Sequence, residues 1–114
     1  MSRLYLVLAV LVILLGVVHV SATAALFDAL NSRAIWFAGG GLAIILTGVL
    51  NLLNRAYGAA ARGVRWAAVG ANAAMTVFSA LAGVAGAASG AELVVIVGLM
   101  ATTTLVSLRP PVSA

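Results

Sequence analysis

The chain has 114 residues, of which 65% are hydrophobic and 7% are charged. Soluble domains carry about 25% charged residues, so this composition excludes a water-soluble globular protein and indicates a surface that mostly contacts lipid. The net charge of +4 comes from six Arg residues set against Asp28 and Glu92. Because the Arg residues are scattered, they do not form the dense basic face that a nucleic-acid partner requires. The absence of cysteine excludes disulfides, thiolate metal sites and cysteine nucleophiles.

The charged residues separate four uncharged runs, each a candidate membrane span. A helix rises about 1.5 Å per residue, so a hydrocarbon core about 30 Å thick requires roughly 20 residues. The sequence therefore predicts an all-α, polytopic membrane protein in which four transmembrane helices form one antiparallel bundle, a single domain over residues 1–114. We expect the helices at approximately 4–25, 34–54, 65–88 and 92–108.

The first predicted helix, 4–25, is rich in Leu and Val and contains one glycine, Gly16. This composition favours a helix that faces lipid, because close helix packing in membranes relies on small residues. The same region resembles a secretory signal, with Arg3 before an apolar stretch and small residues at 22–24. The apolar stretch is long for such a signal, which favours a retained helix.

His19 is the only titratable side chain well inside an uncharged run. It is a candidate proton or ligand site, with Asp28 and Glu92 as possible partners on the same side of the membrane. The first helix has no carboxylate before Asp28, so proton coupling would depend on His19 alone. The alternative is structural, with the imidazole hydrogen-bonded to Ser21, Thr23 or a backbone carbonyl.

Polar residues follow one face of the second helix and one face of the third. At about 100° per residue, the polar residues of the second helix fall within a stripe of about 60°. The candidate polar patch consists of Thr47, Asn51, Asn54, Asn72, Thr76 and Ser79. A short loop joins the two helices, so Asn51 and Asn72 can face each other and share hydrogen bonds. The patch is either a structural clamp or a small polar cavity, open to the cytoplasmic side, that contacts a ligand.

Small residues spaced by four form two ridges on the third helix, which predicts close contact with neighbouring helices. One ridge consists of Ser79, Gly83 and Ala87, and the other of Ala82, Gly86 and Gly90. We therefore predict helix packing through Gly83, Gly86 and Gly90. The neighbour is either another helix of this chain or a second copy of it.

The fourth helix carries three consecutive threonines, Thr102, Thr103 and Thr104. They span about 200° around the helix, so they cannot all face one neighbour. We expect at least one to return its hydroxyl to a backbone carbonyl of its own helix. Pro110 stops the helix because proline cannot donate a backbone hydrogen bond.

The Arg residues predict the orientation. With four spans, one side of the membrane holds Arg3, Arg55, Arg62, Arg65 and Arg109, whereas the other holds Arg33 with both acidic residues. Cytoplasmic loops carry the excess of Arg and Lys. We therefore predict a bacterial-type cytoplasmic (inner) membrane protein with both termini in the cytoplasm (N-in/C-in).

No pattern in the sequence points to catalysis: there is no Ser/His/Asp arrangement, paired carboxylate, phosphate-binding loop or metal signature. The sequence thus favours a non-enzymatic protein without cofactors or metals. We expect an accessory or scaffold subunit, surrounded by membrane lipids, that associates with a larger membrane complex or with itself. The alternative is an oligomeric transporter or channel for a small solute or lipid-like ligand that uses the polar patch on the second to fourth helices.

Overall fold

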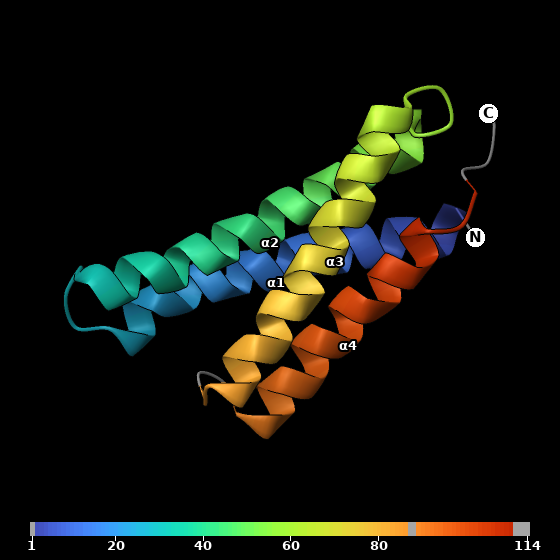
Figure 1. Cartoon of the computed structure of the whole chain (residues 1–114). Coiled ribbons are helices and arrows are strands. Elements are labelled where there is room, and N and C mark those ends of the chain that lie inside the picture. The colour runs from blue at the N-terminus through green and yellow to red at the C-terminus, as the bar shows by residue number, and fades with distance from the viewer. Residues whose placement is uncertain (1, 87–88, 111–114) are drawn as a thin grey trace.

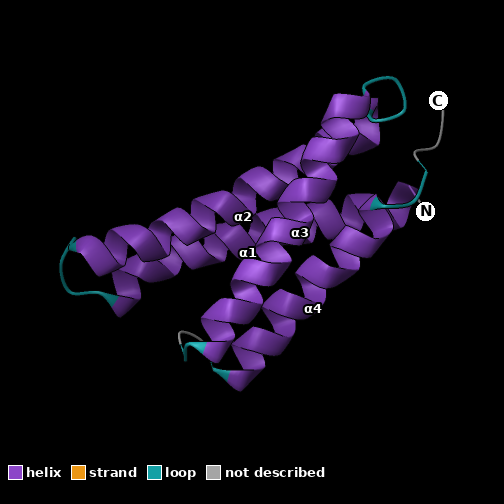
Figure 2. Cartoon of the chain, in the orientation of Figure 1, coloured by secondary structure: helices purple, strands orange, loops and turns teal. Residues whose placement is uncertain are grey.

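The computed structural model describes residues 2–86 and 89–110. Within them every regular element is a helix (Figure 2). The four helices are α1 (Ser2–Leu26), α2 (Ser32–Tyr57), α3 (Arg62–Val84) and α4 (Gly90–Ser107). All four are long and apolar enough to cross a membrane. The prediction of an all-α chain with four candidate spans is confirmed.

Consecutive helices lie side by side in two pairs, α1 with α2 and α3 with α4 (Figure 1). The start of α1, the end of α4 and the α2–α3 connection lie at one end of the molecule, which we call the joined end (Figure 1). From there the two pairs diverge. The α1–α2 and α3–α4 connections are therefore well separated at the opposite end, which we call the open end.

Side-chain caps start two of the helices. Asn31 accepts a hydrogen bond from the backbone of Ala34 at 2.9 Å, which satisfies a free N–H at the start of α2. At the start of α4, Ser89 and Glu92 form a capping box, in which each side chain accepts from the other residue's backbone at 3.3 Å. These caps fix where α2 and α4 begin at the open end.

Residues 87–88 lie outside the described part of the chain, but α3 ends at Val84, earlier than the approximate end predicted from the sequence. The reason is Gly86, whose φ of 77° places it in the left-handed region, where a helix stops. The predicted ridge through Ala82, Gly86 and Gly90 is therefore not on one helix, because Gly90 already begins α4. Ala87, from the other ridge, lies outside the described residues.

The closest helix packing is between α1 and α2, where the sequence did not place it. A Cβ atom added to Gly48 would lie 2.5 Å from Ile13 Cγ1, and one added to Gly41 would lie 2.6 Å from Val20 Cγ2. Gly16 is equally confined, with the backbone oxygen of Gly41 at 2.8 Å. The expectation of a more lipid-facing first helix does not hold for this face, because three glycines bring the backbones of α1 and α2 into contact.

Of the glycines predicted to pack on the third helix, only Gly83 does so. A Cβ there would overlap the side chain of Leu93 on α4, so the contact is internal to the chain. No described residue lies within 4 Å of a Cβ added at Gly86 or Gly90. A small apolar core of Val12, Ile44 and Met100 connects α1, α2 and α4.

Candidate functional site

The polar residues singled out in the sequence lie in two places: a buried hydrogen-bond network toward the joined end, and a cavity toward the open end. The network is built on Asn51 of α2 and Asn72 of α3, both 0% exposed. Asn51 Nδ2 donates to Asn72 Oδ1 at 2.7 Å, and Asn72 Nδ2 donates to Asn51 Oδ1 at 2.8 Å. The pairing that helical periodicity and depth predicted is therefore confirmed.

Tyr5 extends the network to α1. Its hydroxyl donates to Asn51 Oδ1 at 2.5 Å and accepts from Asn54 Nδ2 at 2.8 Å. Asn51 Nδ2 also donates to the carbonyl of Thr47 at 2.9 Å, so both amide hydrogens and both lone pairs of Asn51 are used. Asn51 therefore has no free donor or acceptor to offer a ligand.

Sequence reasoning missed Tyr5 because a tyrosine near a helix end also fits the aromatic belt at a membrane interface. The available signal was its depth. Tyr5 lies near the joined end of α1, as Asn51 and Asn54 lie near the joined end of α2, and a buried tyrosine hydroxyl needs a partner. Asn54 Oδ1 is also buried, and no described residue donates a hydrogen bond to it.

Threonine hydroxyls carry the network toward α4. Thr76 and Thr104 lie 3.2 Å apart, oxygen to oxygen, across the α3–α4 contact. The hydroxyl of Thr47 returns to the carbonyl of Ala43 at 2.8 Å. All three consecutive threonines of α4, Thr102 included, return their hydroxyls to carbonyls four residues earlier at 2.7 Å, as the sequence predicted for at least one.

The start of α3 is also tied to the end of α4, because Arg65 donates to the carbonyl of Leu108 at 2.9 Å. The same guanidinium lies 5.1 Å from the ring centre of Trp66. Side-chain bonds thus connect all four helices toward the joined end. These bonds favour the interpretation of the polar patch as a structural clamp.

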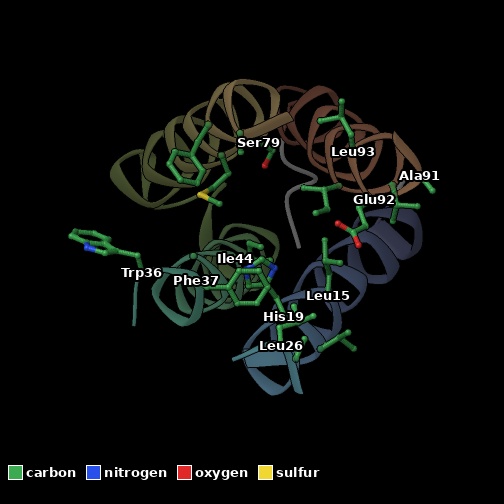
Figure 3. A pocket seen from close by; sticks show the side chains of 18 residues that line it. Leu15, His19, Leu26, Trp36, Phe37, Ile44, Ser79, Ala91, Glu92 and Leu93 are labelled. Atoms are coloured by element: carbon green, nitrogen blue, oxygen red, sulfur yellow. The ribbon is translucent and has the colours of Figure 1, made fainter. Parts of the chain in front are cut away.

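The cavity has a volume of about 780 Å³ and lies between the two helix pairs toward the open end. Its walls come from residues 15–26 of α1, 36–44 of α2, 75–82 of α3 and 91–96 of α4. Most of the wall is apolar. Figure 3 shows its polar members, His19, Ser79 and Glu92.

Only two of the sequence-predicted candidates, His19 and Ser79, line this cavity. The other members of the polar patch lie in the network instead, so the structure divides between two places what the sequence treated as one site. The lining residues that sequence reasoning did not assign to a site include Trp36 and Phe37. The aromatic pair had the ordinary explanation of an interfacial belt.

His19 forms part of the cavity wall with two aromatic rings. Its imidazole stacks on Phe37, with ring centres 3.9 Å apart and an angle of 15° between the planes. Phe27 packs against Phe37, with the two ring centres 5.5 Å apart. The hydroxyl of Thr23 approaches the backbone carbonyl of His19 at 3.5 Å rather than its ring. Glu92 shares the cavity with His19, and Asp28 is not among the lining residues.

Over residues 2–86 and 89–110, no three side chains of the metal-binding types come together. Comparisons with protein families, with curated proteins and with solved structures found no match for the chain. The features that bear on function are therefore the network, the cavity and the outer surface of the helices.

Proposed function

We propose that the chain is a non-enzymatic, multi-pass protein of a bacterial-type cytoplasmic membrane that acts as an accessory or scaffold subunit. In this proposal the helices cross the membrane in alternating directions and both termini are cytoplasmic. The excess of Arg on one side supports this orientation, because Arg55, Arg62 and Arg65 all flank the α2–α3 connection.

The observation that carries the proposal is a pair of glycines on α3. They have the same spacing as two glycines of α2 that contact α1. Gly41 and Gly48, seven residues apart on α2, receive the backbone of α1. Gly63 and Gly70 have the same spacing on α3, and nothing lies within 4 Å of a Cβ added to either. This pair therefore has no neighbour within the described part of the chain.

Two exposed alanines continue the same face of α3. We call the face formed by Gly63, Ala67, Gly70 and Ala74 the α3 strip; all four residues are exposed. Glycine in a helix costs about 0.8–1.0 kcal/mol relative to alanine, and here no contact within the chain offsets it. Small residues let a second helix approach closely and gain van der Waals contacts that lipid does not supply. The α3 strip therefore suits the transmembrane helix of a partner subunit.

The alternative of a transporter or channel working through the polar patch receives less support. Asn51 and Asn72 would have to break their mutual hydrogen bonds before they could bind a solute, and Asn51 would also lose Tyr5. The α3 strip, in contrast, is free to bind without any rearrangement.

The test uses glycine-to-leucine variants that do not disturb the chain itself. Gly70→Leu fills the α3 strip, and Gly98→Leu is the matched control because Gly98 on α4 is also exposed with nothing within 4 Å of an added Cβ. Each variant is purified from native membranes in mild detergent, and co-purifying proteins are quantified by mass spectrometry.

We expect the wild type and Gly98→Leu to retain a partner in fixed stoichiometry, and Gly70→Leu to lose it while remaining folded. A complex made only of this chain would identify the partner helix as that of a second copy. A monomer without any stoichiometric protein in the wild type, or equal retention in both variants, would refute the proposal.

A further inference from the structure

The cavity between the two helix pairs is partly open to the surroundings and large enough to hold a small molecule. Its walls are apolar except for three side chains, and a water molecule needs 2–4 polar partners to remain in such a space. An empty volume of about 780 Å³ would deprive the lining residues of van der Waals contacts. The volume lies within the range of about 300–1,000 Å³ that is typical of small-molecule sites. The surrounding membrane can supply molecules that are soluble in lipid.

Two oxygen-bearing side chains determine which polar groups such a molecule could carry. Ser79 is only 8% exposed, its hydroxyl points into the cavity, and it forms no hydrogen bond with another described residue (Figure 3). Glu92 turns its carboxylate into the cavity, and the capping box occupies one of its oxygens (Figure 3). A carboxylate only accepts hydrogen bonds, so a molecule bound here must donate one. Ser79 can donate to a second oxygen of the same molecule.

The charge of the wall disfavours an anionic group. Among the described residues no Arg lines the cavity, and Glu92 is the only lining residue with a full charge. An anionic group placed here would therefore face a carboxylate and no cationic side chain of the wall. The wall favours a neutral polar group.

The aromatic residues favour a flat ring. The stacked pair of His19 and Phe37 forms one side of the cavity, and Trp36 and Phe78 also line it. Aromatic rings prefer offset-stacked or edge-to-face contacts with other rings. Deeper in the membrane the lining residues are aliphatic or thioether side chains, including Leu15, Ile44 and Met75, which suit an apolar tail.

We propose that this cavity binds a neutral, membrane-soluble compound of the phenol or hydroquinone class with an apolar tail. A ring hydroxyl donates to Glu92, a second ring oxygen accepts from Ser79, and the ring packs against the His19–Phe37 stack. The tail extends between the two helix pairs. This inference is independent of the α3 strip, which lies on another face of the molecule.

The test measures binding of radiolabelled decylhydroquinone to the full chain in phosphatidylcholine nanodiscs. We expect saturable binding of one molecule per chain above the partitioning into empty nanodiscs. The dimethyl ether of the same compound cannot donate a hydrogen bond, so it should compete at least tenfold more weakly. Phosphatidylethanolamine added to the nanodiscs should not displace the probe.

Three variants locate the site. Glu92→Gln keeps an acceptor for the capping box but removes the charge, and Ser79→Ala removes the free hydroxyl. Each should weaken binding about tenfold, in line with about 1.4 kcal/mol for the loss of one hydrogen bond. Ala82→Phe should fill the cavity and abolish binding. Thr102→Ala, whose hydroxyl is exposed away from the cavity, is the control and should bind as the wild type does.

A spectroscopic readout shows whether the folded protein carries the probe at this place. The chain has two tryptophans, so Trp66→Phe leaves Trp36, an exposed residue at the edge of the cavity, as the only reporter. Titration with the probe should change the Trp36 emission. In the Ser79→Ala variant the same change should require a higher probe concentration than in the protein that keeps Ser79. The proposal is overturned by non-saturable uptake, by equal competition from the dimethyl ether, by displacement with phosphatidylethanolamine, or by unchanged binding in Ala82→Phe.

Discussion

The pair of asparagines allows the clamp to be measured as a coupling energy. Asn51 and Asn72 share two hydrogen bonds, of 2.7 and 2.8 Å, between side chains that are fully buried. Hydrogen bonds between membrane helices contribute about 0.6 kcal/mol on average and about 1.7 kcal/mol at most. The two bonds together therefore predict a coupling of about 1 kcal/mol, with an upper limit of about 3 kcal/mol.

The experiment is a double-mutant cycle with Asn51→Ala, Asn72→Ala and the double variant. Unfolding is followed by circular dichroism during titration with SDS in mixed micelles. Asn51→Ala should cost more than Asn72→Ala, because it also leaves the hydroxyl of Tyr5 without its acceptor. Thr102→Ala is a control that should change stability little, since its exposed hydroxyl bonds only to its own helix.

The result also separates structure from ligand binding. If the network is only a clamp, the Asn72→Ala variant should lose stability but still bind the decylhydroquinone probe. Additive costs for the two asparagines, with no coupling, would refute the reasoning. Loss of probe binding without loss of stability would show that the polar patch belongs to the binding site.

Two further predictions concern packing and orientation. Gly48→Leu should destabilise the chain by about 1–3 kcal/mol because its Cβ meets Ile13 across the α1–α2 contact. Gly98→Ala should leave the free energy of unfolding in SDS equal to that of the wild type or slightly higher. Equal effects at the two glycines would contradict the close packing of α1 on α2. Because the chain lacks cysteine, single cysteines placed at Ala60 and Leu30 report topology through a membrane-impermeant thiol reagent. We predict that intact cells label the cysteine at position 30 only; labelling at position 60 instead would invert the proposed orientation.

The fold was largely predictable because the features that determine it are local. Gaps between charges set the four helices, and the 3.6-residue period together with depth placed Asn51 opposite Asn72. The first prediction uses only the sequence of each helix, and the second also uses the short connection between α2 and α3. The end of α3 at Val84, just before Gly86, was missed because glycine both packs helices and ends them, and only the backbone conformation distinguishes the two roles.

The candidate site was less predictable because it depends on how the helix pairs diverge. Nothing in the sequence near Ser79 or Glu92 shows that the two residues face the same cavity, since they come from different helices with a turn between them. The partner of each glycine was hidden for the same reason: Gly48 and Gly70 lie on similar small-residue faces, yet one is filled by α1 and the other is open. Helical periodicity identifies a face but not the neighbour that covers it.

The arrangement of the molecule links these features. Hydrogen bonds between side chains hold the four helices toward the joined end, and the glycine contacts keep α1 against α2 along most of their length. The second pair, α3 and α4, is thus free to diverge and to form the cavity. Its outer surface, including the α3 strip, remains available for a partner.

Photo-crosslinking in intact cells tests the central claim, that the α3 strip contacts another transmembrane helix. A benzoylphenylalanine residue is introduced at Ala74 in the α3 strip and, as a control, at Leu14, which is 53% exposed on α1. We predict a discrete crosslinked protein from position 74 and none from position 14. The absence of any adduct at position 74, or the same adducts from both positions, would contradict it.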